Sequence, residues 1–146
     1  MLALKVLAYF IVGVCILFFL LGLKSQKGKA KGLHEGELAK LPASPNCVSS
    51  EADTQPERAV EPLKAGLSTA KAAVVDTGGI VTSEAGDYIS ATYMSKLFKF
   101  VDDVELRDAG NGHVHIRSAS RVGYSDRGIN RKRVENIRAA LKKQIA

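Results

Sequence analysis

The sequence predicts an α+β protein: a small, mostly antiparallel sheet of about four strands packed with an N-terminal and a C-terminal helix, preceded by one transmembrane helix. Three observations predict it. An uncharged run lies near the start, short alternating segments separated by turn residues fill the middle, and an amphipathic pattern closes the chain. A chain of 146 residues has the size of one domain with appendages. We expect a transmembrane anchor over 1–23, a flexible tether over 24–60 and a globular domain over 61–146.

The anchor is predicted from the 18 uncharged residues between Val6 and Leu23. As a helix they would span about 27 Å, close to the hydrocarbon thickness of a bilayer. The exit "LGLKSQKGK" lacks the Ala-x-Ala site of a cleaved signal peptide. We therefore expect a single-pass membrane protein, in the inner membrane if the source is bacterial. Four lysines follow the span and one precedes it, which favours a cytoplasmic domain, but the side is left open.

The tether is predicted from composition. Residues 24–60 are rich in Gly, Ser, Pro and charge and have no hydrophobic period, so they cannot bury enough apolar surface to fold alone. Their second half contains "LPASPNCVSS", which is rich in turn residues. We expect this half to dock on the domain.

The domain is expected to begin with a helix near Pro62. Leu63, Leu67, Ala70 and Val74 share one helical face, and a Gly-Gly pair at 78–79 would end the helix.

Strands are expected next. One starts at Ile80, the second is the β-rich "YISATY", and the third is "LFKFVDDVELRD". The Asn111-Gly112 pair then predicts a hairpin into "HVHIRSAS". In that last strand Val114, Ile116, Ser118 and Ser120 share one face, and His113, His115, Arg117, Ala119 and Arg121 share the other.

The last element is predicted as a helix from about residue 127 to 145. Its apolar stripe consists of Val134, Ile137, Leu141 and Ile145. Ser125 or Asp126 could cap its first N–H groups.

The arginine-rich turn "RSASRVGYSDRGINRKRVE" is the candidate ligand site, because guanidinium groups and a helix N-terminus both attract anions. The candidate ligand-binding residues are Arg117, Ser118, Ser120, Arg121, Asp126, Asn130 and Arg131. Two interpretations stay open. The turn could bind a phosphate, a carboxylate or a lipid headgroup, or Arg117 and Arg121 could pair with Asp102, Asp103 and Asp126 and fix the turn to the sheet.

Other patterns point less clearly to chemistry. Cys47 is a structural or reactive candidate, with His113 or His115 as a base in the second case. The same two histidines lack an evident third metal ligand. There is no phosphate-binding glycine loop, Ser elbow or paired-Cys spacing. We therefore predict no metal, no cofactor and no catalytic residues.

Three blocks carry a family resemblance: "LPASPNCVSS", "YISATYMSKLFKFVDDVELR" and "RSASRVGYSDRGINRKRVENIR". They resemble, over roughly residues 41–140, the signature blocks of the domain-of-unknown-function family 1499. The resemblance implies a bacterial or plastid domain of the cell envelope, often behind an export or membrane segment, with no established activity. Many members have a further Cys just before the Pro-Asn-Cys block. This chain has none there, so a disulfide from Cys47 to that partner is not available.

Charge indicates the class of partner. Residues 111–146 carry nine basic and two acidic side chains, a net charge of +7, and the whole chain carries +6. Behind a membrane anchor, anionic lipid or a small anion is the expected partner rather than nucleic acid, and a protein partner stays open. We expect a membrane-anchored binding or interaction domain. The alternative is an enzyme acting on an anionic envelope metabolite.

Overall fold

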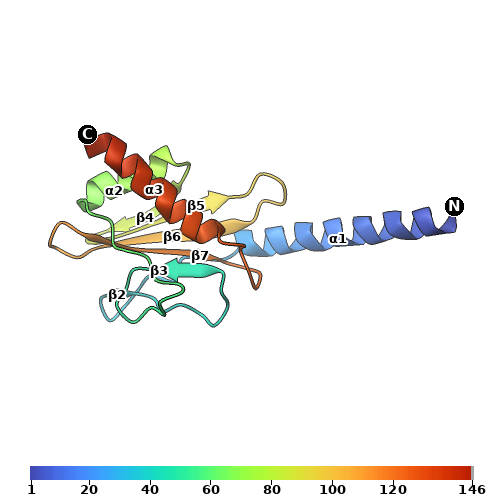
Figure 1. Cartoon of the computed structure of the whole chain (residues 1–146), viewed down its shortest axis with the longest axis horizontal. Coiled ribbons are helices and arrows are strands. Elements are labelled where there is room, and N and C mark those ends of the chain that lie inside the picture. The colour runs from blue at the N-terminus through green and yellow to red at the C-terminus, as the bar shows by residue number, and fades with distance from the viewer. Residues whose placement is uncertain (146) are drawn as a thin grey trace.

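The structure is a computed structural model that describes residues 1–145. It begins with one long helix, α1 (Leu2–Gln26), which projects from the rest of the molecule (Figure 1). The helix is long and apolar enough to cross a membrane, and only Gly22 and Ser25 of its residues are buried. Large apolar side chains are exposed on all sides of the helix between Val6 and Leu23.

A five-stranded antiparallel sheet with the order β3-β7-β6-β5-β4 forms the centre of the domain. Its strands are β3 (Cys47–Ser49), β4 (Ile80–Ala85), β5 (Tyr88–Met94), β6 (Val101–Asp108) and β7 (Val114–Ser120). The turns at 86–87 and 109–113 join neighbouring strands, as the sequence predicts. The fifth strand, β3, was not predicted. It pairs with β7 at the edge of the sheet, where Cys47 faces Ala119.

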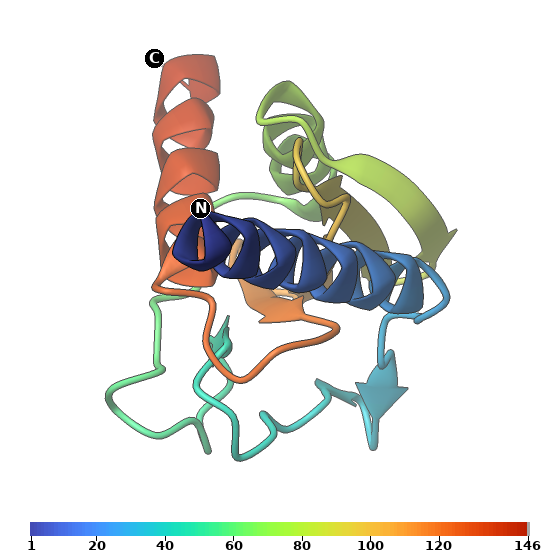
Figure 2. The ribbon, with the colours of Figure 1, turned by 90° about the vertical axis from the view of Figure 1, so that its right-hand side faces the viewer.

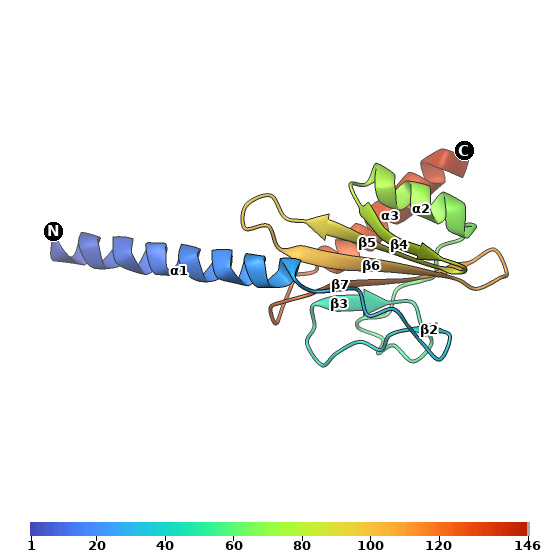
Figure 3. The ribbon, with the colours of Figure 1, turned by 180° about the vertical axis from the view of Figure 1, so that it is seen from behind.

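Both domain helices, α2 (Leu67–Asp76) and α3 (Ile129–Ile145), cover one face of the sheet (Figure 3). The α+β class is therefore confirmed. The core lies between this face and the helices, and Val74, Ile89, Leu106, Ile116 and Ile137 are among its fully buried side chains. Val134 and Leu141 of the predicted α3 stripe are buried as well, while Ile145 lies outside the described side chains.

The start of α2 differs from the prediction. Leu63 was placed in the helix, but it exchanges two backbone hydrogen bonds of 2.9 Å with Val114 and lies in an isolated β-bridge. Gly66 is extended and caps the helix, which begins at Leu67. Leu63 still joins the core, because a strand-like residue packed against β7 can be buried as fully as a helical one.

The opposite face of the sheet is covered by the segment that follows α1. This segment contains a two-stranded hairpin of β1 (Leu33–His34) and β2 (Glu37–Leu38), and β2 contacts β6 and β7. Figures 2 and 3 show it on the side of the sheet away from α2 and α3. Residues predicted as a tether from their composition thus lie packed on the domain in this structure.

Candidate functional site

The face of the sheet away from the helices carries a layer of ion pairs. Arg117 Nη1 contacts Glu105 Oε2 at 2.6 Å, and these residues lie directly opposite each other on β7 and β6. Arg121 contacts Asp103 through two hydrogen bonds of 2.6 and 2.8 Å. Because side chains alternate along a strand, the acids of β6 and the arginines of β7 meet on one face. Of the pairs considered in one of the two open interpretations, those of Arg117 and Arg121 with Asp102, Asp103 and Asp126, only Arg121–Asp103 is found among the described residues.

The layer is buried, and its polar groups are mostly satisfied. Arg117 is 3% exposed and Glu105 is 0% exposed. The Tyr88 hydroxyl donates to Glu105 Oε1 at 2.7 Å, and burial together with this bond raises the pKa of Tyr88. Hydrogen bonds to Asp103 raise the pKa of Arg121, so this guanidinium stays charged. One donor is left over, because Arg117 Nε is buried and has no hydrogen-bond partner among the described residues.

The segment after α1 binds this layer through its backbone. Gly32 N donates to Glu105 Oε1 at 2.7 Å, and Leu38 N donates to Glu51 Oε1 at 3.0 Å. The end of α1 is held too: Ser25 Oγ accepts from Val101 N at 3.0 Å, and Ser25 O accepts from Arg121 Nη1 at 3.2 Å. Carboxylates that would otherwise face water are thereby covered.

A cavity of 820 Å³ lies between this segment and the ionic layer. We call it the basic cavity. Its lining includes five cations, Lys29, Lys31, Lys40, Arg117 and Arg121, together with His34, and one acid, Asp103. Lys40 pairs with Asp53 at 3.0 Å, and Lys29 and Lys31 form no salt bridge among residues 1–145. The cavity wall therefore has an excess of positive charge, and the two unpaired lysines, Lys29 and Lys31, are exposed.

The predicted site residues fall into separate groups. Arg117 and Arg121 line the basic cavity, and Ser120, at the end of β7, also borders it. Ser118 and Ser120 point to the helix-covered face, where Asn130 links them: Ser118 Oγ donates to Asn130 Oδ1 at 2.6 Å, and Asn130 Nδ2 donates to Ser120 Oγ at 3.0 Å. Asn130 Nδ2 also donates to Asn46 O at 2.9 Å. This fully buried amide joins β7, α3 and the segment before β3.

Asp126 caps α3 and pairs with no arginine among the described residues. Its Oδ2 accepts from Asn130 N at 2.7 Å, and its Oδ1 accepts from Gly128 N at 3.0 Å. Asp102 was considered as a partner of Arg117 or Arg121. It pairs with Arg133 instead, whose Nη2 lies 2.6 Å from Asp102 Oδ2. Asp102 faces the helices, whereas Arg117 and Arg121 lie on the other side of the pleat.

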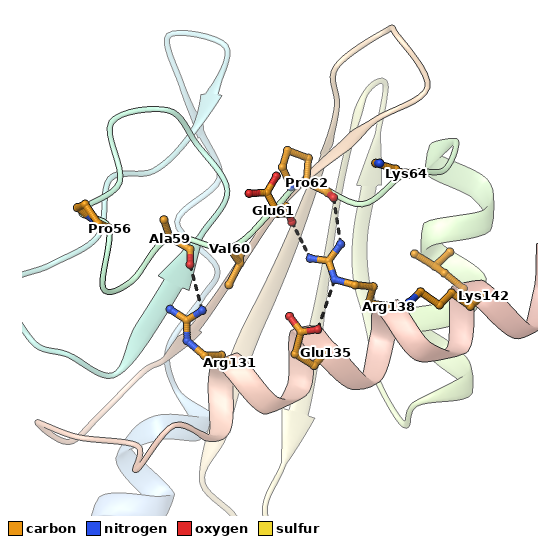
Figure 4. A pocket seen from close by; sticks show the side chains of 11 residues that line it. Pro56, Ala59, Val60, Glu61, Pro62, Lys64, Arg131, Glu135, Arg138 and Lys142 are labelled. Carbon is orange, nitrogen blue, oxygen red and sulfur yellow. Dashed lines mark hydrogen bonds and ion pairs between the residues drawn. The ribbon is translucent and has the colours of Figure 1, made fainter.

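Arg131, the last candidate, belongs to a second groove of 950 Å³ between α3 and residues 56–64 (Figure 4). It donates to Ala59 O at 3.1 Å and to Glu57 O at 2.8 Å. Arg138 in the same groove donates to Pro62 O and Glu61 O at 3.2 and 2.8 Å. Both guanidiniums thus bind the backbone of the segment that crosses α3, which makes this groove a packing interface.

Cys47 is a free, buried thiol at the edge of the sheet. Its Sγ donates to Ser44 O at 3.4 Å, and burial raises its pKa, which disfavours the nucleophilic thiolate. The two histidines considered as its base have other partners: His115 Nδ1 lies 3.2 Å from Ser50 Oγ and 3.4 Å from Glu51 Oε2, and His113 Nδ1 lies 3.3 Å from Asn111 O. The arrangement favours the structural interpretation of Cys47.

Several residues of the site were not predicted as ligand residues, among them Glu51, Arg107, Lys29, Lys31 and His34. Arg107 binds Glu51 through two hydrogen bonds of 3.0 and 2.8 Å. The alternation Asp103, Glu105, Arg107 along β6 was a usable signal for the ionic layer, because these positions share one face. The lysines follow α1 in a segment whose composition is that of a linker.

Fold and site together define a small α+β domain with helices on one face of its sheet and a buried ionic layer on the other, following one helix of membrane-spanning length. A family model described as "Protein of unknown function (DUF1499)" matches residues 37–141. The match covers more than half of the chain, so the protein belongs to this family. No curated protein and no solved structure matches the chain.

Proposed function

We propose that the protein is a membrane-anchored binding domain that takes an anionic group in the basic cavity. α1 supplies the anchor. Its uncharged run is of bilayer length, and its apolar side chains are exposed on all sides of the helix. A fully exposed apolar helix of this length is costly in water and stable in lipid.

Arg117 carries the proposal for the cavity. Its guanidinium is buried, lines the cavity, and has one carboxylate partner, Glu105, while its Nε has none. An unsatisfied buried donor on a charged group costs roughly 1–3 kcal/mol or more. An unsatisfied buried donor in a native structure calls for an explanation, and a bound ion is one. A phosphate or carboxylate beside Arg117 could accept from the N–H that Glu105 leaves unpaired.

The surroundings of Arg117 favour a small anion over a neutral ligand. Five Lys or Arg side chains line the cavity, and three of them are paired: Arg117 with Glu105, Arg121 with Asp103 and Lys40 with Asp53. Two cations, Lys29 and Lys31, have no salt-bridge partner among the described residues. Lys29 and Lys31 follow the last residue of α1 by three and five positions. In a membrane they would lie next to the headgroups, where both lipid phosphates and dissolved anions are within reach.

Inorganic phosphate is the probe for the test, with the full chain in neutral detergent micelles. We expect phosphate to raise the melting temperature, because a ligand that binds the folded state stabilises it. The double variant Lys29→Gln/Lys31→Gln should keep the melting temperature without phosphate and bind phosphate about three- to tenfold more weakly. The matched control Lys142→Gln/Lys143→Gln removes two exposed charges at the far end of α3 and should bind normally.

No stabilisation of the wild type at millimolar phosphate would reject the site. Equal weakening by the control pair would show that phosphate binds by general charge rather than in the cavity.

A further inference from the structure

The end of the domain beside α1 has an unusual surface. Two loops lie there (Figure 1), each taken with one flanking residue: residues 94–100, from the last residue of β5 to the start of β6, and residues 121–129, from the end of β7 to the first residue of α3. We call them the interfacial loops. They expose four large apolar side chains: Met94, Leu97, Tyr124 and Ile129, at 55, 78, 76 and 54%. Outside α1, only Val75 and Ile80 among the described residues are comparable, so the apolar exposure is concentrated at this end.

The first loop packs directly on α1. The Phe18 ring lies 5.3 Å from the Phe98 ring and 6.1 Å from the Phe100 ring, between centroids. A Cβ at Gly22 would lie 1.9 Å from Phe98 O, so only glycine admits this approach. The loop therefore packs on the last turns of α1. If α1 spans a bilayer, the depth of the loop in that bilayer is set by the depth of those turns.

The turn of α1 that contacts the loop belongs to the apolar run between Val6 and Leu23. Phe18 precedes Leu23, the end of the run, by five residues, which is a rise of about 7.5 Å along a helix. A segment seated beside Phe18 would thus reach roughly the depth of interfacial helices, about 5–10 Å into the boundary between headgroups and acyl chains. A cavity of 800 Å³ opens at the same end, between α1 and the second loop. Its lining combines apolar and aromatic side chains, among them Phe18, Leu21, Tyr124 and Ile129, with the charged side chains Asp102, Asp126, Arg127 and Arg133.

Charge at this end suits an anionic membrane. Lys96 and Lys99 lie in the first loop and Arg127 in the second; all three are exposed, and none is in a salt bridge within residues 1–145. Apolar and aromatic side chains flanked by cations are typical of segments that lie at the surface of a bilayer. Each such cation contributes about 1 kcal/mol of attraction to anionic lipid close to the surface.

We infer that the interfacial loops are inserted into the headgroup region of a bilayer that carries anionic lipid, so that the domain lies in the membrane surface. This inference rests on the proposal that α1 spans the membrane. It adds a second contact, made by the domain itself, with Leu97 and Tyr124 at its centre and Lys96, Lys99 and Arg127 at its margin.

The chain contains no Trp, so single Trp substitutions report depth without background. The full chain is placed in nanodiscs of phosphatidylcholine and phosphatidylglycerol, with or without bromine on the acyl chains. Four variants are compared: Leu97→Trp, Tyr124→Trp, Phe10→Trp within the apolar run of α1, and Asn111→Trp in the hairpin between β6 and β7. We expect blue-shifted emission and marked quenching by bromine for the first three, and emission at the water-exposed wavelength without quenching for Asn111→Trp.

The outcomes separate the two proposals. If Phe10→Trp is not quenched, α1 does not span the bilayer. The proposal that α1 is an anchor and the proposal that the loops insert are then both rejected. If Phe10→Trp is quenched while Leu97→Trp and Tyr124→Trp behave like Asn111→Trp, the anchor stands and the insertion of the loops is overturned.

Discussion

Glu51 joins three segments of the chain through one carboxylate. Its Oε1 accepts from Leu38 N and Arg107 Nε, each at 3.0 Å, its Oε2 accepts from Arg107 Nη2 at 2.8 Å, and His115 Nδ1 lies 3.4 Å from Oε2. Burial alone would raise the pKa of Glu51, but the hydrogen bonds from Arg107 and Leu38 outweigh it, and the pKa is lowered overall. The ionised carboxylate therefore stabilises the folded state.

The pH dependence follows from the sign of this shift. A pKa that is lower in the folded state gives stability that is complete above the unfolded value, about 4.3 for Glu, and is lost as the pH falls through the folded value. At pH 7 we expect Glu51→Gln to lose roughly 3 kcal/mol of unfolding free energy, because it leaves Arg107 without its anion. Urea unfolding at pH 7 and pH 3 measures this. The difference from wild type should shrink at pH 3.

The control for Glu51 is Glu84→Gln, which removes an exposed pair with Lys71. It should cost less than about 1 kcal/mol at both pH values. A Glu51→Gln deficit that is equal at pH 7 and pH 3 would contradict the role given to the ionised carboxylate.

The pair of Arg117 and Glu105 is suited to a double-mutant cycle, because the two residues are buried and directly opposed. We expect Arg117→Met and Glu105→Leu each to cost about 3–5 kcal/mol, since each leaves a buried charge without its partner. The double variant should cost clearly less than the sum of the two, because it leaves neither charge. Chemical denaturation measures all three, and additive losses would contradict the pairing.

Among the elements, α3 is the one whose pattern and structure agree most fully. Its buried positions Val134, Ile137 and Leu141 follow the predicted stripe, and the Asp126 cap was one of the two expected. Strands β5, β6 and β7 were predicted for the same reason, since alternation over seven or eight residues is a strong signal.

Other elements lack such a signal. β3 has three residues in a segment rich in Ser and Pro, and its strand conformation depends on pairing with β7. Residues 27–40 are held partly by the backbone N–H groups of Gly32 and Leu38, which any residue except proline could supply, and partly by the buried side chains of Leu38 and Ala39. Composition does not record such contacts.

Only some of the predicted site residues lie together, because neighbouring side chains of a strand point to opposite faces of the sheet. The pleat places Arg117 and Arg121 on the face of the basic cavity, and Ser118 and Ser120 on the face of Asn130. A turn read as one cluster along the sequence is thus divided between two faces of the sheet.

The prediction for α3 concerns Ile137, which is 0% exposed in the middle of the stripe. Ile137→Ala should create a cavity and cost roughly 2–5 kcal/mol. Lys142→Ala and Lys143→Ala are exposed and should each change stability by less than about 0.5 kcal/mol. Denaturant unfolding tests this. Hydrogen exchange at Ile137 and Leu141 should be slow without lipid, and fast exchange there would contradict their place in the core.

For the whole molecule, the first question is whether the chain stays in the membrane intact. We expect the full chain to resist extraction with alkaline carbonate and to keep its full mass of 15.6 kDa. A chain that begins at Lys24 retains Ser25 and its contacts with Val101 and Arg121, and should be soluble. Fractionation with intact-mass measurement tests both, and a shortened mature form would contradict the anchor and indicate a cleaved signal.

The attachment of the chain to β6 and β7 immediately after α1 has a consequence for encounter with partners. Gly32, whose N–H is bonded to Glu105, lies six positions after Gln26, so the chain between them spans at most about 20 Å even if fully extended. With α1 in a bilayer, this short connection keeps the domain close to the membrane surface. Its encounters are then two-dimensional, and any partner has to diffuse in the same membrane or come to its surface.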